Sequence, residues 1–254
     1  MADPIPAPLL EIRGLRVRIG DREVLKGINL AIGDGETHVL LGPNGGGKTT
    51  LLNTILGFPG YEVIDGEILF KGTDLLPLAI DERARLGIGV AFQRPPAVRG
   101  VRLRQMMSVA SAGSLDDAGV TAIAGDLDVE AMLERDVNAG FSGGEAKRSE
   151  MAQLLAQKPA LALFDEPESG VDLENIAVVG AAMQRLLKGE KASDPKRAGL
   201  IITHTGHILD YVNADVGHVL FNGRLACAGN PRDLVGEIAL QGFEKCVECA
   251  LCQS

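Results

Sequence analysis

The sequence predicts an α/β fold built around a phosphate-binding loop, with a small helical subdomain inserted into it. Three observations predict this: a glycine-rich loop at residues 42–49, an apolar run that stops at Asp165-Glu166, and a mostly helical pattern at residues 95–140. Short apolar runs are typical of strands buried in a parallel sheet, which binds ligands at the carboxyl ends of its strands. We therefore expect the functional site at that edge.

The first element is the loop Gly-Pro-Asn-Gly-Gly-Gly-Lys-Thr. Residues 39–41 predict a buried strand entering it, and residues 50–56 predict a helix leaving it, closed by Gly57. In this setting backbone amides surround the β- and γ-phosphates, the lysine adds a positive charge and the threonine offers its hydroxyl to Mg²⁺. A glycine-rich turn without a ligand is the alternative, which the context disfavours. We expect ATP to be bound by Gly42, Pro43, Asn44, Gly45, Gly46, Gly47, Lys48, Thr49 and Thr50.

The second element is Asp165-Glu166, at the end of the apolar run at residues 161–164. The aspartate suits Mg²⁺ held through water, and the glutamate can orient and deprotonate an attacking water. An ordinary acidic turn after a strand is the alternative. The phosphate-binding loop in the same chain favours the functional interpretation.

The third element is Ser142-Gly143-Gly144-Glu145, at the start of a predicted helix. Serine followed three residues later by glutamate is a capping box. The hydroxyl, the bare glycine amides and the positive end of a helix dipole also suit an anion. Both interpretations can hold, but a capping box alone does not need two consecutive glycines.

Two further polar residues follow predicted strands. Gln93 follows residues 89–92 and can reach Mg²⁺ or the attacking water, whereas alone it would be read as a surface glutamine. His204 follows residues 199–203 and can contact the γ-phosphate, whereas a lone histidine is more often structural.

The inserted subdomain carries helical patterns at residues 101–112 and 118–133, where Met106 and Met107 face a partner or fill a core. We divide the chain into an α/β core at residues 8–94 and 141–236, a helical subdomain at residues 95–140 and a cysteine-bearing tail at residues 237–254.

The tail contains Cys246, Cys249 and Cys252. Thiolates at this spacing favour soft metals or an iron–sulfur cluster, but the closing Cys-Pro of the cluster pattern is missing. Cys227 can add a fourth ligand only if the fold brings it close. A site for iron, zinc or an iron–sulfur cluster, an accessory thiol role and an incidental tail all stay open.

Composition narrows the class of protein. A chain of 254 residues, 46% of them hydrophobic, can bury one large core and a small appended subdomain. The net charge of −9 argues against a nucleic-acid partner, and no apolar run is long enough to span a membrane. The N-terminus lacks the pattern of a signal peptide, so we expect a soluble, cytoplasmic protein with reduced thiols.

Six motifs stand in the order found in ABC ATPases, and the chain resembles that family. They are the P-loop, Gln93 of the Q-loop, Ser142-Gly143-Gly144 of the signature, Asp165-Glu166 of Walker B, Asp172 of the D-loop and His204 as the switch histidine. The resemblance implies an ABC-type P-loop ATPase core with a small helical subdomain inserted. It implies that catalysis is carried out by Glu166, His204, Gln93 and Lys48. It implies that Mg²⁺ is held by Thr49, Gln93 and Asp165. It also implies contact with ATP in a second copy by Ser142, Gly143, Gly144, Glu145 and Asp172.

Finer details resemble SufC-like ATPases of the SUF iron–sulfur cluster assembly system. They include Glu145 where transporters usually have glutamine, Tyr61-Glu62-Val63, Ala91-Phe92-Gln93 and residues 208–211. This resemblance, over residues 8–236, implies a soluble Mg-ATPase subunit that drives conformational change in a SufB-like or SufB/SufD-like scaffold by ATP-dependent dimerisation. The alternative is the ATP-binding subunit of a membrane ABC transporter. Ala146 stands where SufC-like chains often carry lysine, and Pro167-Glu168 after the glutamate is transporter-like.

Overall fold

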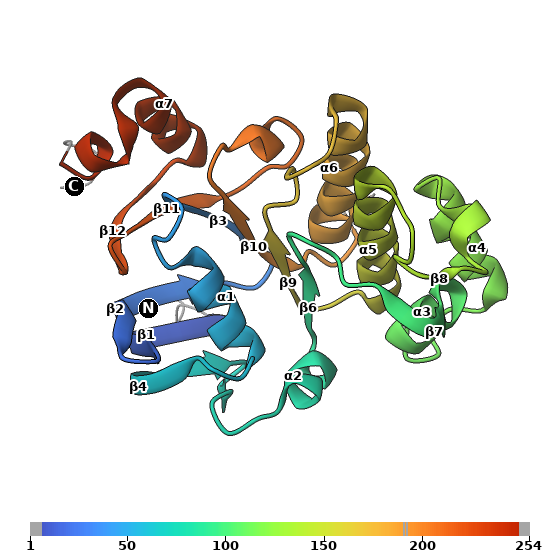
Figure 1. Ribbon diagram of the computed structural model, residues 1–254, viewed down its shortest axis with the longest axis horizontal. Helices are drawn as coiled ribbons and strands as arrows, with labels where there is room; N and C mark the ends of the chain where they lie inside the picture. The colour runs from blue at the N-terminus through green and yellow to red at the C-terminus, as the bar shows by residue number, and fades with distance from the viewer. Residues whose placement is uncertain (1–6, 190, 192, 249–254) are drawn as a thin grey trace.

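A six-stranded sheet forms the centre of the computed structural model (Figure 1), which describes residues 7–189, 191 and 193–248. Its strand order is β12-β11-β3-β10-β9-β6, and every neighbouring pair is parallel except β11 and β12. The carboxyl ends of the five parallel strands therefore share one edge. The strands are β3 (Thr37–Leu41), β6 (Ile88–Ala91), β9 (Leu161–Asp165), β10 (Ala198–Thr203), β11 (Val216–Phe221) and β12 (Arg224–Gly229).

Strand β9 shows why the apolar runs predict a buried parallel sheet. All five of its residues are buried. Leu161 and Leu163 join one core cluster, and Ala162 and Phe164 join the other. Successive side chains of a strand point to opposite faces, so both faces of β9 must be apolar. The predicted strand at residues 161–164 is confirmed.

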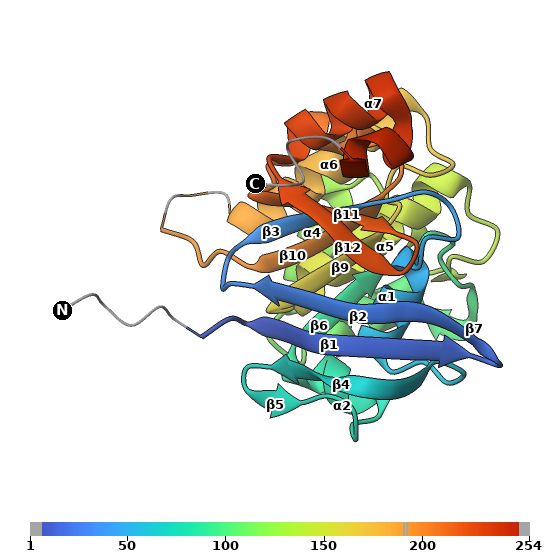
Figure 2. The same cartoon turned by 90° about the vertical axis from the view of Figure 1, so that its left-hand side faces the viewer.

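One face of the central sheet packs against helix α1 (Lys48–Leu56) and an antiparallel sheet. That sheet has the order β2-β1-β4-β5, from β1 (Leu10–Ile19), β2 (Arg22–Ile32), β4 (Glu62–Phe70) and β5 (Thr73–Asp74). Figure 2 shows it below the central sheet. Helix α1 ends at Gly57 in the left-handed region, as predicted.

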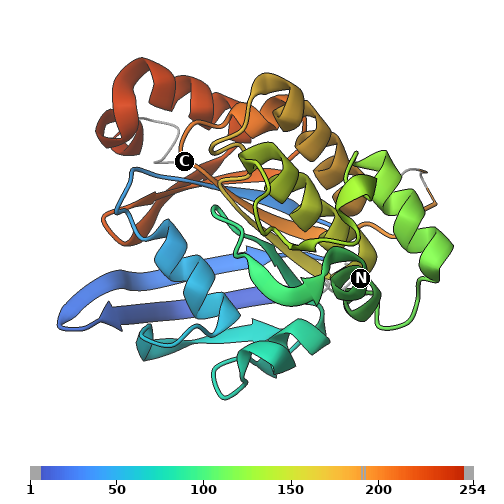
Figure 3. The same cartoon turned by 45° about the vertical axis from the view of Figure 1, so that its right-hand side comes forward.

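The opposite face is covered by helices α5 (Gly143–Gln157) and α6 (Leu173–Lys188), which lie in front of the sheet in Figure 3. The insert packs against α5 through α3 (Leu103–Ala110) and α4 (Asp117–Asp126). Strands β7 (Val98–Arg102) and β8 (Asp136–Val137) pair at its base. Helix α7 (Pro231–Glu248) packs against β11 and β12, and α2 (Ile80–Leu86) precedes β6.

The insert differs in detail from the predicted pair of helices. The helix predicted at residues 118–133 ends at Asp126, Asp128 adopts a φ of 52°, and a short 3-10 helix, η1 (Glu130–Met132), follows. A left-handed residue breaks the helical hydrogen-bond ladder, which hydrophobic spacing cannot reveal.

Met107 is fully buried, whereas Met106 lines a surface groove. Helix α7 crosses residue 236, and the predicted domain division stays a prediction.

Candidate nucleotide site

The loop between β3 and α1 owes its shape to its glycines. Gly47 precedes Lys48, the first residue of α1, with a φ of 110°. A Cβ atom on Gly47 would lie 2.8 Å from Leu25 Cδ2, and one on Gly42 would collide with the Leu220 carbonyl oxygen. A side chain at either position would be strained or would push strands apart. The loop therefore lies close to the core beneath it.

Lys48 is turned into this loop. Its Nζ donates to the carbonyl oxygens of Gly42 at 2.7 Å and Pro43 at 3.1 Å. Burial lowers the pKa of Lys48, and the charges of Glu166 and Asp165 oppose that shift. A nearby phosphate would favour the charged ammonium in the same way as these carboxylates.

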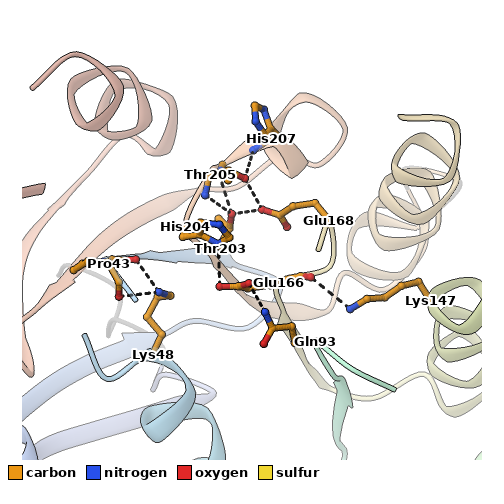
Figure 4. Close-up of polar contacts among 12 residues, drawn as sticks. Pro43, Lys48, Gln93, Lys147, Glu166, Glu168, Thr203, His204, Thr205 and His207 are labelled. Atoms are coloured by element: carbon orange, nitrogen blue, oxygen red, sulfur yellow. Dashed lines mark hydrogen bonds and ion pairs between the residues drawn. The ribbon is translucent and has the colours of Figure 1, made fainter. Parts of the chain in front are cut away.

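Three predicted catalytic residues meet through direct hydrogen bonds (Figure 4). The Glu166 carboxylate accepts from Gln93 Nε2 at 2.6 Å, and its other oxygen lies 3.0 Å from His204 Nδ1. Each follows a different central strand: Gln93 comes after β6, Glu166 after β9 and His204 after β10. Glu166 is buried and has a φ of 46°, which is unusual for a residue other than glycine.

A cavity of about 450 Å³ joins these side chains to the loop. The loop residues Asn44, Gly45, Gly47, Lys48, Thr49 and Thr50 line it together with Gln93, Glu166, Ser169 and His204. The structure thus brings most of the predicted ATP-binding and catalytic residues to one place, at the carboxyl edge of the sheet.

The predicted magnesium ligands supply oxygen atoms at the same edge. Asp165 ends β9, Thr49 lies in the first turn of α1, and Gln93 follows β6. Burial, and then the adjacent Glu166 charge, raise the pKa of Asp165, while Lys147 and Lys48 oppose this. Carboxylate, hydroxyl and amide oxygens are ligands that Mg²⁺ accepts, and a divalent cation would offset the crowded negative charge. These residues fit the ion.

The signature residues lie elsewhere in the same chain. Ser142 Oγ accepts from the Glu145 backbone N–H at 3.3 Å, and Glu145 Oε2 accepts from the Ser142 N–H at 2.7 Å, which confirms the capping box. Both residues lie outside the described lining of the nucleotide cavity, as does Asp172. Asp172 caps α6, and its Oδ1 accepts from the backbone and side chain of Asn175.

The signature and the D-loop share one exposed edge. A Cβ atom on Gly143 would lie 2.8 Å from the Gly170 carbonyl oxygen, and one on Gly144 would lie 2.6 Å from the Asn175 side chain. The two glycines are therefore needed for close packing of α5 on the start of α6. This explains why a simple capping box does not account for them.

A set of polar residues that no sequence motif indicated supports the catalytic ones. Lys147 Nζ donates to the Phe92 carbonyl at 2.6 Å and the Glu166 carbonyl at 3.4 Å. Glu168 accepts from the hydroxyls of Thr203 and Thr205, on either side of His204. The apolar face formed by Met151, Leu154 and Leu155 predicts a polar side for Lys147, yet Lys147 is buried. Its three-residue spacing from Glu150 was the available signal.

The cysteine tail is only partly described. Cys246 on α7 and Cys227 on β12 are buried in the same core cluster, and Cys227 takes part in a disulfide. This differs from the expected reduced thiols and removes Cys227 as a thiolate ligand in this state. Cys249 and Cys252 lie outside the described residues. Among the residues that are described, no group of three or more histidine, cysteine, aspartate or glutamate side chains is placed to hold a metal ion.

Comparisons with known proteins agree with the motifs. The family model described as ABC transporter matches residues 25–169. The chain is 38% identical over 248 residues to a probable ATP-dependent transporter SufC of Escherichia coli (strain K12), covering 92% of this chain and 97% of that protein. It is 36% identical over 249 residues to a probable ATP-dependent transporter ycf16 of Cyanophora paradoxa, covering 93% of both.

Solved structures show the same fold. An ATP-binding cassette of an ABC transporter in its ADP conformation matches with a TM-score of 0.74 at 22% identity, covering 96% of this chain and 98% of that one. An ATP-binding subunit of an ABC transporter matches with a TM-score of 0.75 at 24% identity, covering 94% and 97%. No described helix is long and apolar enough to cross a membrane. The chain belongs to the ABC family, as a SufC-like ABC ATPase that hydrolyses ATP.

Proposed function

We propose that this ATPase drives conformational change in a SufB-like or SufB/SufD-like scaffold of iron–sulfur cluster assembly, through ATP-dependent pairing of two copies. The observation that carries the pairing is the separation of the two phosphate-contacting elements. The loop cavity contains Lys48 and Glu166, whereas Ser142 lies on an exposed edge outside its lining. Similarity to the E. coli SufC over 92% of the chain supports the assignment to iron–sulfur cluster assembly.

Within one copy, we assign hydrolysis to the residues gathered at the cavity. Lys48 and the loop amides would hold the phosphates, and Glu166 would accept a proton from the attacking water. Gln93 and His204 hold the Glu166 carboxylate in place. Mg²⁺, held by Thr49, Gln93 and Asp165, would neutralise charge on the β- and γ-phosphates.

Between two copies, the exposed edge of α5 and α6 would complete the site. Ser142 Oγ and the amides of Gly143 and Gly144 begin a helix, where donors and the helix dipole favour an anion. Asp172 lies beside them through Asn175. We propose that these residues face the γ-phosphate of ATP bound to the other copy.

The scaffold would dock in a groove of about 630 Å³ between α2, β6, α3 and α5, which we name the α3–α5 groove. Apolar side chains dominate its lining, including Met106 and Val109, and Val109 is 77% exposed. Phe92, which also lines it, directly precedes Gln93. A segment bound here would touch the strand end that carries a catalytic side chain.

A membrane transporter is the second candidate function. The relatives from E. coli and Cyanophora are named as probable transporters, and a permease segment could occupy the same groove. The chain would then be a separate ATP-binding subunit. The identity of the second chain in the purified complex distinguishes the two functions.

The first prediction separates binding from turnover. Lys48→Ala should lose ATP affinity because it removes the buried cation. Glu166→Gln should keep affinity but lower turnover by about 10²–10⁴-fold, because the amide keeps the shape and lacks the basicity. Calorimetric titration and phosphate release measure the two effects, with exposed Leu240→Ala as control. Equal loss of ATP binding in both folded variants contradicts the assignment of Glu166.

The second prediction concerns pairing. In the Glu166→Gln background, ATP should convert monomers into dimers in light scattering, and an added Ser142→Arg should prevent this by placing a bulky cation at the shared site. Ser114→Arg, at an exposed loop position, is the matched control. A dimer that forms without nucleotide and tolerates Ser142→Arg would rule out the shared site.

The third prediction concerns the partner. Purification of the tagged chain from its own cells should yield a soluble SufB-like chain, identified by mass spectrometry. Val109→Asp should weaken that complex about tenfold or more, because it places a charge in the apolar groove. Leu240→Asp is the control on another exposed apolar side chain. Recovery of a membrane permease instead would favour the transporter function.

The fourth prediction concerns the tail, where iron, zinc or an iron–sulfur cluster stays a hypothesis. Its support is the spacing of Cys246, Cys249 and Cys252. Protein purified anaerobically with a reductant, which opens the Cys227 disulfide, should carry substoichiometric iron or zinc that is lost when all three are replaced by serine, while ATP turnover continues. Equal metal content by elemental analysis in both proteins would leave the tail without a metal role.

A further inference from the structure

Two buried hydrogen-bond acceptors line the α3–α5 groove. The Glu150 side chain is on α5, and Asn138 follows β8; both residues are more than nine-tenths buried. Glu150 Oε2 and Asn138 Oδ1 accept no hydrogen bond from any residue that the structure describes. Buried acceptors are normally satisfied, and each one left without a donor destabilises the state that contains it. The groove is otherwise mainly apolar, so a partner that binds there can supply the hydrogen-bond donors that these two oxygens do not have.

The remaining polar atoms of these side chains are engaged. Glu150 Oε1 accepts from the Phe92 backbone N–H at 3.1 Å, and Asn138 Nδ2 donates to the Pro96 carbonyl at 3.0 Å. Each side chain is thus fixed by one hydrogen bond to the segment that follows β6. Both side chains line the groove, and each has a second polar atom, a buried oxygen that accepts no hydrogen bond from the described residues.

Glu150 is also connected to the catalytic carboxylate. Lys147, one turn earlier on α5, donates to the Phe92 carbonyl at 2.6 Å. Helix α5 therefore holds both backbone polar groups of Phe92, one from each side chain. The next residue, Gln93, donates to Glu166 at 2.6 Å. A group that binds Glu150 is therefore connected to the site of hydrolysis through Phe92 and Gln93, which contacts Glu166.

Glu150 is the one carboxylate among the described residues that line the groove, which also include the cations Arg85 and Lys158. Burial raises the pKa of Glu150 to about 7, and the Phe92 hydrogen bond and the Lys147 charge oppose that shift. The positive charge of Lys147 also interacts with other carboxylates besides Glu150, so it does not neutralise Glu150 alone. Arg85 and Lys158 add positive charge to the lining of the groove. Asp165, Glu166 and Glu168 interact with Lys147.

We propose that the α3–α5 groove recognises an apolar segment of the scaffold that carries one arginine or lysine, whose donors bind Glu150 Oε2 and Asn138 Oδ1. The inference rests on the proposed docking of a scaffold in this groove. Two acceptors require donors, and because one acceptor is a carboxylate, a cation is the complementary group. A purely apolar segment would leave both acceptors unpaired, and a carboxylate placed against Glu150 would repel it.

The test measures affinity of the purified SufB-like scaffold from the same genome for wild-type chain and for Glu150→Gln at pH 8. Glutamine keeps an oxygen for the Phe92 N–H but loses the charge, so we expect binding to weaken about tenfold or more. Glu130→Gln makes the same change at an exposed position outside the groove and should bind as wild type does.

A pH series gives a second readout on the wild-type chain. A bound cation lowers the pKa of Glu150 in the complex, so the contribution of this pair is complete above the pKa of the unbound chain and is lost as pH falls through about 7. Wild-type affinity should therefore fall roughly tenfold more between pH 8 and pH 6 than that of Glu150→Gln. Titrating groups on the scaffold affect both proteins equally and cancel.

The outcomes separate this inference from the proposed function. A stable wild-type complex that Glu150→Gln neither weakens nor makes less dependent on pH overturns the cation and leaves the scaffold in place. Absence of any complex with the wild-type chain overturns the proposed scaffold function, and this inference with it. Affinity that rises as pH falls, in wild type alone, contradicts a cationic partner and indicates an acceptor that binds protonated Glu150.

Discussion

The carboxylate of Glu166 is the point on which the arrangement of the nucleotide site depends. It is held by Gln93 and His204, and the three residues follow β9, β6 and β10. These strands are neighbours in the order β10-β9-β6. Since parallel strands in register end at one edge, side chains that are 73 and 38 residues away from Glu166 in sequence reach it directly. The register depends on the two apolar faces of β9, because a slip by one residue would exchange the two core clusters.

Buried charge at this edge is balanced locally. Lys48 and Lys147 approach the pair Asp165-Glu166 from opposite sides, one from the loop and one from α5. Burial lowers the pKa of both lysines, and the carboxylates raise it. Removal of one partner would leave an uncompensated charge in a low-dielectric interior, which is strongly destabilising. The same balance makes the site sensitive to what binds there, because ATP adds negative charge that Lys48, the loop amides, Mg²⁺ and the donors proposed from another copy would have to offset.

The sequence was sufficient for the parts of the site that follow one strand or one loop. The P-loop, Asp165-Glu166, the end of α1 at Gly57 and the capping box at Ser142 all depend on residues close together in the chain. Met151, Leu154 and Leu155 fall on one face of the helix that begins after Ser142, which predicts a polar face for Lys147 and Glu150. That pattern cannot distinguish a solvated face from one buried under an inserted subdomain, since α5 packs on the sheet, on α6 and on α3. The break at Asp128 and the disulfide of Cys227 likewise depend on backbone conformation and packing that spacing does not encode.

Helix α5 links three surfaces that different partners would use. Its first residues lie at the edge proposed for the second copy, Lys147 contacts the backbone of Glu166, and Glu150 lines the groove proposed for the scaffold. A helix is stiff along its axis because each turn is hydrogen-bonded to the next. When α5 shifts as one body, Glu150 at the groove and the signature residues at the start of the helix therefore move together. The Phe92 backbone is held by α5 at both its N–H and its carbonyl. A shift of α5 would therefore also shift Gln93, the next residue, against Glu166 at the end of β9. A scaffold that repositions α5 would in this way change both the shared edge and the hold on the catalytic carboxylate, without touching the nucleotide.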